Sequence, residues 1–261
     1  MTHTQQFIVE KIQAPQFGIH LFRERLHASF EEGLNSCTST IITGRTGLGK
    51  TVFAADEASK SGALVSWYRV DATDCNLASF LRYFTTSVRS HFPFFWLNPD
   101  SPFGDESSEN ATFIAEALVF QMVKSVTNRL LIVIDDIHHI YDQPWFVPLF
   151  SRMLPLLPND VHVVMCGRGL PPTPLWRMRS KQFLTVFDEH QLGFTEEETI
   201  ELYSLFNLSE KIALESYRQF NGKASQLHEY ARQVCRVPID HRYCKETIHS
   251  GVIVTHDMLQ Q

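Results

Sequence analysis

Short apolar runs alternate with longer amphipathic segments along most of the chain. The runs have the length of β-strands and are rich in Val, Ile, Leu and aromatic residues. They are continuous rather than alternating, which is typical of strands that helices cover on both faces. This order of segments predicts an α/β domain with a mainly parallel sheet. The five runs lie at residues 40–43, 63–70, 130–134, 161–166 and 183–187.

Amphipathic segments between and after the runs predict helices. The character of the chain changes after residue 187, where Thr195 and Glu198 match a capping box and apolar residues then recur at helical spacing. We therefore expect an α/β core over residues 1–190 and a small helical lid over residues 191–236. The weakly periodic segment 237–261 is left unassigned. Predicted helices lie at residues 50–59, 77–90, 111–128, 209–220 and 224–234.

A proline-containing segment, residues 92–110, separates two of the predicted helices and ends in an acidic, serine-rich stretch. This composition is typical of a surface loop. The Phe-Phe-Trp cluster within it is either a docking patch or, in the alternative that we favour, packs against the flank of its own domain.

The segment after the first apolar run matches G-x-x-x-x-G-K-[ST] at every fixed position. Glycines let such a loop bend around a phosphate and point backbone N–H groups at it, and the following helix presents its positive dipole end to the same anion. The lysine adds a charge near the β- and γ-phosphates, and the last hydroxyl is a Mg²⁺ ligand. We expect nucleotide binding by Gly44, Arg45, Thr46, Gly47, Leu48, Gly49, Lys50 and Thr51.

Charged residues follow the third and fourth apolar runs. A buried strand in mid-sheet delivers Asp135 to the carboxyl edge, where ligands bind in open α/β sheets. There we expect Asp135 and Thr51 to hold Mg²⁺, and Asp136 to polarise an attacking water as a catalytic residue. Arg168 is either a second catalytic residue, which contacts the γ-phosphate, or an exposed surface charge.

Composition and charge restrict the class of protein. Hydrophobic residues at 44% and charged residues at 20% are ordinary for a globular protein. The net charge of −6 gives no basic surface for nucleic acid, and the five cysteines contain no Cys-x-x-Cys pair that would predict a zinc site. Neither a secretory signal nor a membrane-spanning apolar stretch is recognisable. We expect a soluble, cytoplasmic protein without a membrane or nucleic-acid partner.

Taken together, these segments resemble the STAND class of signal-transducing NTPases within the AAA+ group. The likeness is greatest to the ATPase domain of the large LuxR-type, ATP-binding transcriptional activators of the maltose-regulon kind, and it runs through residues 12–236. The most selective part is the ordered set formed by residues 67–71, 135–138 and 168–172. The matching segments are residues 22–26, 44–51, 65–71, 80–83, 130–138, 154–158, 166–172 and 192–198.

The resemblance implies a P-loop NTPase fold, a three-layer α/β/α arrangement with strand order 5-1-4-3-2. It implies ATP or ADP with Mg²⁺ as cofactors, and an adenine bordered by residues 19–23, with Arg23 among the nucleotide-binding residues. It also places Arg168 at the γ-phosphate. Members of this family use ATP as a switch: ADP holds a closed resting form, and an inducer allows exchange and self-association. A protein partner or self-association is therefore expected beside the nucleotide.

The chain departs from this family in two respects. The Gly-Trp-Pro of the family's lid is replaced by Gly222-Lys-Ala224, and no winged-helix module, sensor repeats or helix-turn-helix reader is recognisable. Three functions stay open. The first, which we favour, is a regulatory switch with slow ATP hydrolysis, in signal transduction or transcriptional regulation. The others are a motor-type ATPase or P-loop kinase, with Arg177 and Arg179 as candidate trans-acting arginines, and a scaffold in which ATP is structural.

Overall fold

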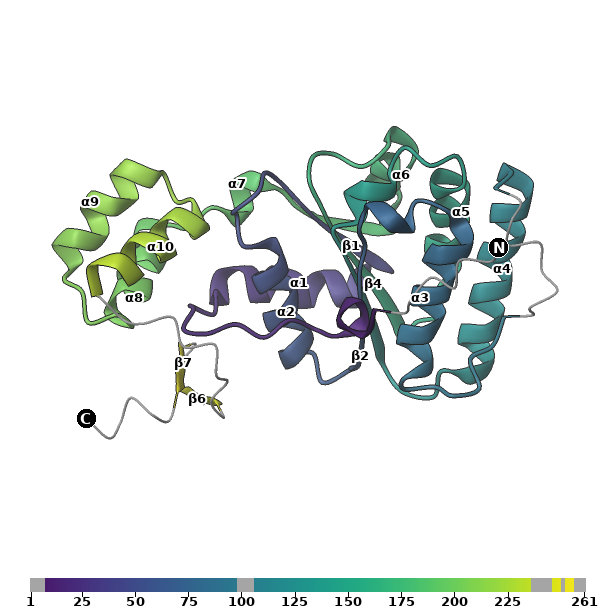
Figure 1. Cartoon of the computed structure of the whole chain (residues 1–261), viewed down its shortest axis with the longest axis horizontal. Coiled ribbons are helices and arrows are strands. Elements are labelled where there is room, and N and C mark those ends of the chain that lie inside the picture. Colours follow the sequence, from purple (N-terminus) through teal and green to yellow (C-terminus); the bar gives the residue numbers. More distant parts are fainter. Residues whose placement is uncertain (1–7, 98–105, 236–245, 250–251, 256–261) are drawn as a thin grey trace.

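The centre of the molecule is a five-stranded sheet, shown in Figure 1 in a computed structural model that describes residues 8–97, 106–235, 246–249 and 252–255. All pairings between neighbouring strands of this sheet are parallel. The strand order β2-β3-β4-β1-β5 is the predicted order 5-1-4-3-2 read from the opposite edge, so the predicted fold is confirmed. The strands are β1 (Ser39–Thr43), β2 (Leu64–Arg69), β3 (Leu130–Asp135), β4 (Val161–Gly167) and β5 (Leu184–Phe187).

The three inner strands are buried along their whole length, which explains why their apolar runs are continuous. On β3, Leu131 and Val133 pack into one layer of the core, whereas Ile132 and Ile134 pack into the other. Because successive side chains alternate between the faces of a strand, Asp135 falls on the face of Leu131 and Val133.

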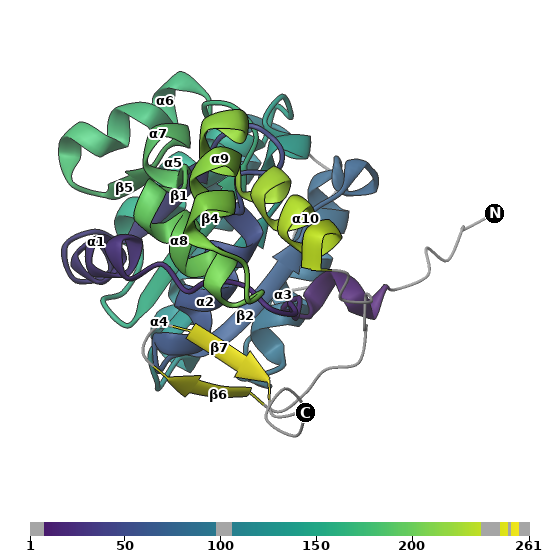
Figure 2. The ribbon, with the colours of Figure 1, turned by 90° about the vertical axis from the view of Figure 1, so that its left-hand side faces the viewer.

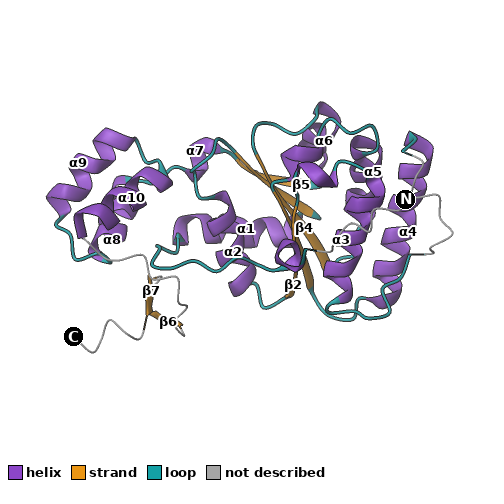
Figure 3. Ribbon diagram, viewed as in Figure 1, coloured by secondary structure: helices purple, strands orange, loops and turns teal. Residues whose placement is uncertain are grey.

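Helices cover the two faces of the sheet to different extents (Figure 3). One face carries α1 (Glu24–Ser36) and α2 (Lys50–Lys60), where Phe30 and Phe53 meet edge to face. The other face carries a thicker, aromatic-rich layer. Helices of this second layer are α3 (Leu77–Arg89), α4 (Ser108–Ser125), α5 (Phe146–Met153) and α6 (Thr173–Trp176).

A separate helical group follows the sheet and faces the viewer in Figure 2. The short α7 (Glu189–Leu192) leads from β5 to this group. The predicted capping box is present, since the Thr195 hydroxyl accepts from the Glu198 N–H and the Glu198 carboxylate accepts from the Thr195 N–H. Leu21, from the N-terminal segment, packs into the apolar core of the group. Its helices are α8 (Glu196–Ser204), α9 (Glu210–Phe220) and α10 (Ala224–Cys235).

The structure adds elements that the sequence pattern did not predict. α1 contains Gly33 and ends in Asn35 and Ser36, residues of low helix propensity, so its local signal is weak. Gly33 is nevertheless required, because a Cβ there would lie 2.9 Å from the Thr185 hydroxyl on β5. Short 3₁₀ helices also join the elements, at Val9–Ile12, Ala72–Asp74, Ile137–Ile140, Leu154–Leu156 and Arg177–Lys181.

The Phe-Phe-Trp cluster divides between the core and the surface. Phe95 is buried, whereas Phe94 is 89% exposed and Trp96 is 51% exposed beneath the Arg89 guanidinium. The rest of that loop, residues 98–105, lies outside the described residues, and α4 already begins at Ser108 because the Ser107 hydroxyl caps it.

An antiparallel pair of strands, β6 (Glu246–His249) and β7 (Val252–Thr255), is found in the segment left unassigned, and the remainder of that segment lies outside the described residues. None of the helices in the described part of the chain combines the length and apolar character that crossing a bilayer requires.

Candidate functional site

The loop between β1 and α2 bends sharply around an open centre. Gly44, Gly47 and Gly49 have φ angles of 147°, 87° and 79°, which residues with a side chain rarely adopt. A Cβ on Gly44 would also lie 2.7 Å from the Leu48 side chain. The loop therefore needs the glycines that the motif supplies, and it presents backbone rather than side chains to a ligand.

Lys50 opens α2 and lies almost completely buried beneath the loop. Its ammonium donates to the carbonyl oxygens of Gly44, at 2.7 Å, and Arg45, at 2.9 Å. Burial lowers the pKa of Lys50, because a buried ammonium has lost part of its hydration. These contacts hold the Lys50 ammonium at the loop, where its positive charge would compensate the negative charge of a bound polyphosphate.

Asp135 ends β3 opposite the start of α2. The Thr51 hydroxyl donates to the Asp135 carboxylate at 3.3 Å, and the Asp136 N–H donates to the same oxygen at 3.0 Å. Burial, reinforced by the charge of Asp136, raises the pKa of Asp135 to about 6. A cation bound between Asp135 and Thr51 would offset the unfavourable free energy of burying the Asp135 carboxylate charge.

The oxygen atoms of Asp135 and Thr51 fit Mg²⁺ better than a softer metal. Magnesium takes one or two protein oxygens and completes its octahedron with water and phosphate. In the part of the chain that the structure describes, no cluster of three or more His, Cys, Asp or Glu side chains is placed to hold a metal. The pair thus suits a cation that a nucleotide helps to bind.

Asp136 and Arg168 lie at neighbouring strand ends. Asp136 adopts a left-handed conformation, with φ of 55°, and its carboxylate lies 3.8 Å from the His138 ring. Arg168 follows β4, the strand between β1 and β3, and its side chain is exposed. Among the described residues Arg168 has no hydrogen-bond or ion-pair partner. Its guanidinium therefore remains available to a ligand.

A cavity of about 510 Å³ brings most of the predicted site residues together. Lys50, Thr51, Asp136 and Arg168 line one side of it, and Arg23 lines another. Further walls come from the N-terminal segment and from the helical group. The lining also includes Phe17, Gly18, Ile19, His20, Leu21, Thr46, Gly47, Gly49, Phe194, Ala224, Ser225 and His228.

Four predicted residues, Gly44, Arg45, Leu48 and Asp135, do not line this cavity, and Asp135 lines a separate cavity beside it. The side chains of Arg45 and Leu48 line a second cleft on the outer side of the loop. Arg45 there forms an ion pair with Glu189, which lowers the pKa of that carboxylate. A nucleotide contact by these two residues stays a prediction, and it would involve their backbone.

Arg23 is buried and holds the N-terminal segment against the helical group. Its guanidinium donates to the Leu192 carbonyl at 2.6 Å and lies over the rings of Phe53 and Phe194. Burial lowers the pKa of Arg23 to about 10. The structure thus gives Arg23 a bracing role, and direct contact with a nucleotide stays a prediction.

Comparison with known proteins gives distant relatives. No family model matches the chain. Over 168 residues the chain is 25% identical to the serine/threonine-protein kinase PknK of Mycobacterium tuberculosis and of Mycobacterium bovis, a match that covers 62% of this chain. It spans 15% of the length of those relatives, so their activity as whole proteins does not transfer to it.

Solved structures agree on the architecture. The Walker-type ATPase PABY2304 of Pyrococcus abyssi aligns with a TM-score of 0.52 at 12% identity, covering 83% of this chain and 68% of that one. The STAND protein PH0952 of Pyrococcus horikoshii, which has a tetratricopeptide repeat sensor, aligns with a TM-score of 0.53 at 16% identity. That alignment covers 88% of this chain and 32% of the other. The chain has the P-loop NTPase fold.

Sequence reasoning missed the part of this P-loop site that the helical group supplies. The N–H of Ser225, in the first turn of α10, donates to the Gly47 carbonyl at 2.9 Å. His228, one turn later, bonds to the Ile19 carbonyl at 2.7 Å. The polar i, i+3 pair on α10 was a visible signal, but nothing in the sequence shows what it would meet.

Proposed function

We propose that the chain is an ATP- and ADP-binding switch domain that hydrolyses ATP slowly with Mg²⁺. The observation that carries this proposal is the bond from the Ser225 N–H to the Gly47 carbonyl, which ties the lid to the phosphate loop itself. Core (1–190) and lid (191–236) both supply walls of the cavity. A nucleotide that prefers one arrangement of these parts shifts their equilibrium by the difference between its two binding free energies.

Phosphate binding falls to the loop and Lys50. Backbone N–H groups and the N-terminal end of α2 face the anion, and the ammonium moves from its carbonyl partners to the β- and γ-phosphate oxygens. Thr51 and Asp135 would hold Mg²⁺, which would neutralise part of the phosphate charge. The base then lies toward residues 19–23, and adenine rather than guanine is proposed from the family resemblance alone.

Hydrolysis requires a water in line with the γ-phosphorus. The Asp136 carboxylate accepts a proton from this water as its oxygen bonds to phosphorus, and the bond to the β–γ bridging oxygen breaks. The electron pair of that bond stays with ADP, and orthophosphate leaves. Arg168 donates to the γ-phosphoryl oxygens, where negative charge is held during transfer. Slow hydrolysis is what a switch requires, because its ATP-bound state lasts only until the ATP is hydrolysed.

The biological setting is proposed from the resemblance to STAND regulators and LuxR-type activators. In that setting the domain works in the cytoplasm, in signal transduction or transcriptional regulation, and passes its state to a protein partner or to another copy of itself. The lid contact supports such an output, because it connects the phosphate loop to a surface far from the sheet.

Titration with a fluorescent ADP analogue tests the site. Lys50→Ala should weaken binding by tenfold or more, because a charge-assisted hydrogen bond contributes about 1.5–3 kcal/mol. Lys124→Ala, an exposed lysine of α4, is the matched control and should bind like the wild type. Asp135→Ala should remove the Mg²⁺ dependence. Unchanged affinity in Lys50→Ala would refute the nucleotide site.

Turnover separates the switch from its alternatives. We expect ADP to co-purify with the native chain and hydrolysis well below roughly 1 per second, the lower end of ordinary enzyme rates. Fast hydrolysis that rises with protein concentration would instead favour a motor with a trans-acting Arg177 or Arg179. Phosphoryl transfer to a small molecule would favour a kinase, and bound ATP that never turns over would favour a scaffold.

A further inference from the structure

A further cavity, of about 790 Å³ and separate from the cleft that Arg45 lines, is bordered by Asp135 and Asp136. We name it the strap chamber, because residues 8–17 form its outer wall and are called the strap. Thr51 and Asp136 line both this chamber and the cavity of about 510 Å³, hereafter the nucleotide cavity, so the two adjoin where the γ-phosphate would lie. The chamber thus lies beyond the γ-phosphate position, on the side away from where ADP would remain.

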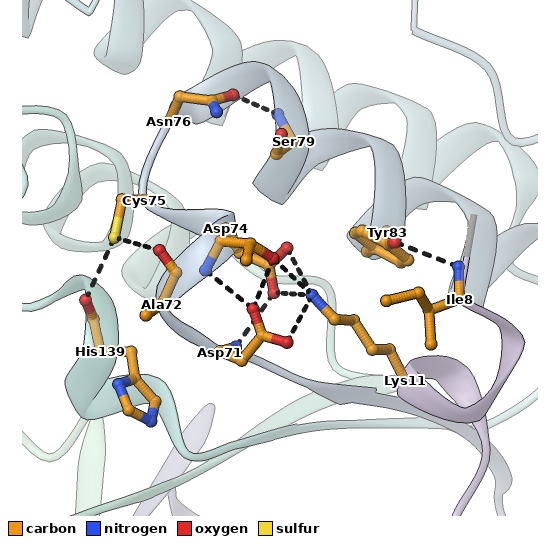
Figure 4. A network of polar contacts seen from close by, with 11 residues as sticks. Ile8, Lys11, Asp71, Ala72, Asp74, Cys75, Asn76, Ser79, Tyr83 and His139 are labelled. Atoms are coloured by element: carbon orange, nitrogen blue, oxygen red, sulfur yellow. Dashed lines mark hydrogen bonds and ion pairs between the residues drawn. The ribbon is translucent and has the colours of Figure 1, made fainter. Parts of the chain in front are cut away.

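The strap is fastened to the segment that follows β2 by an ion-pair network, of which the pair between Lys11 and Asp74 is buried (Figure 4). The Lys11 ammonium, 2% exposed, lies 2.8 Å from both carboxylate oxygens of Asp74 and 2.9 Å from the Asp71 carboxylate. It also lies over the Tyr83 ring, whose hydroxyl accepts from the Ile8 N–H. Breaking a buried pair costs several kcal/mol, so this wall of the chamber is persistent.

Arg69, the last residue of β2, supplies the chamber with a cation. It lies opposite Asp135 in the parallel register of β2 and β3. Nevertheless Arg69 makes no hydrogen bond or ion pair with any residue that the structure describes. Exposed arginines elsewhere, such as Arg45 and Arg152, do bind a carboxylate. The Arg69 guanidinium is therefore free for a ligand.

Strand order places the charged groups in a row along the carboxyl edge of the sheet. The phosphate loop follows β1, Arg168 follows β4, Asp135 and Asp136 follow β3, and Arg69 ends β2. An oxyanion that leaves the loop along this row passes the two carboxylates and then meets Arg69. The carboxylates, including Glu10 in the chamber wall, repel the oxyanion, so its binding there depends on the attraction of the Arg69 guanidinium.

We propose that the strap chamber binds a phosphate-sized oxyanion through Arg69, and that this oxyanion is the orthophosphate released from ATP. The inference rests on the proposed hydrolysis. A guanidinium offers five N–H donors in a fork that matches phosphate oxygens, and the amides of Gln13 and Gln16, which line the same chamber, add neutral donors. Product phosphate then leaves by the strap side, while ADP stays under the lid.

The test measures the binding of inorganic phosphate to the MgADP-loaded chain by calorimetry. Arg69→Gln should weaken phosphate binding about tenfold, the effect of losing one charge-assisted contact, and leave ADP affinity unchanged. Arg69→Lys should retain part of the binding. Arg218→Gln, an exposed arginine of α9, is the control and should bind phosphate like the wild type.

Equal phosphate affinity in Arg69→Gln and the wild type, with ADP still bound, would overturn the chamber assignment. Failure of the wild type to bind ADP would instead refute the proposed function. Lys11→Met, which unfastens the strap, should also weaken phosphate binding. Phosphate binding through Arg69 should persist in Lys50→Ala, because Lys50 does not line the chamber, and its loss there would contradict the assignment to Arg69.

Discussion

At the scale of single residues, the charged groups of the site are held by neutral partners. Lys50 is bound by two carbonyl oxygens, and Asp135 by a hydroxyl and an N–H. In the described part of the chain these two residues form no ion pair with each other. The Lys50 ammonium is therefore available to pair with a polyphosphate, and the Asp135 carboxylate with a cation. Burial lowers the pKa of Lys50 and raises that of Asp135.

Arg168 should distinguish ATP from ADP. If its guanidinium contacts the γ-phosphate, Arg168→Ala should lower the ratio of ATP to ADP affinity about tenfold, because only ATP loses the charge-assisted contact. Arg218→Ala is a suitable control, since Arg218 is also exposed but does not line the nucleotide cavity. Competition titrations with both nucleotides measure the ratio. An unchanged ratio would make Arg168 a surface charge.

His162 should make stability depend on pH. Its Nδ1 lies 3.1 Å from the Cys37 carbonyl and its Nε2 lies 2.9 Å from the Thr40 hydroxyl, and burial lowers the pKa of His162 to about 4. The unfolded chain, with a pKa near 6.5, binds a proton that the folded chain excludes. This contribution is complete above pH 6.5 and is lost as the pH falls toward 4.

Between pH 7 and pH 5 the free energy of unfolding should therefore fall by about 2 kcal/mol through His162 alone. Urea unfolding of the wild type and of His162→Gln at both pH values isolates this part, because Gln keeps hydrogen-bonding groups but does not titrate. A pH dependence of the same size in both proteins would contradict the assignment.

At the scale of elements, two segments of the helical group are tied to each other. The Phe194 N–H donates to the Gly222 carbonyl at 2.9 Å, so the entry to α8 and the start of α10 lie side by side. Gly222 has a φ of 70°, and a Cβ on it would collide with the Phe194 carbonyl. This glycine fixes where α10 begins and thus where Ser225 meets the loop.

Gly222→Ala should destabilise the protein more than Gly62→Ala. Both glycines have positive φ angles, 70° and 65°, so both substitutions cost roughly 1–2 kcal/mol of backbone strain. Only Gly222 adds a collision, because nothing lies within 4 Å of a Cβ on Gly62. We expect an extra cost of about 1–3 kcal/mol at Gly222, measured by urea unfolding. Equal losses would show that the lid connection is not tightly fitted.

At the scale of the whole molecule, the sequence predicted what local pattern determines. Continuous apolar runs marked the buried strands, and the glycine motif marked the loop with Lys50 and Thr51 because its backbone angles exclude other residues. Strand order came from family resemblance, since periodicity carries no information about neighbours. Long-range contacts could not be predicted: His228 and Ile19 are 209 residues apart. Neither could the burial of Lys11, a residue type that is rarely inside.

The nucleotide cavity takes most of its walls from three segments that are distant in the sequence, so a bound nucleotide should join them into one cooperative unit. We expect MgADP to slow amide hydrogen exchange together at residues 17–23, 44–52 and 222–228, because opening any of these segments would then require loss of the ligand. Exchange in α4, which packs on the opposite face of the sheet, should change little and serves as the internal control.

At an ADP concentration that just saturates the wild type, Lys50→Ala should show much less of this protection, since its affinity for the ligand is at least tenfold weaker. Slower exchange confined to residues 44–52 would mean that the nucleotide is held by the loop alone, with the lid and the N-terminal segment indifferent to it. Such a protein would bind nucleotide without transmitting its presence. The proposed switch therefore depends on protection that reaches α10, where the Ser225 N–H is bonded to the Gly47 carbonyl of the loop.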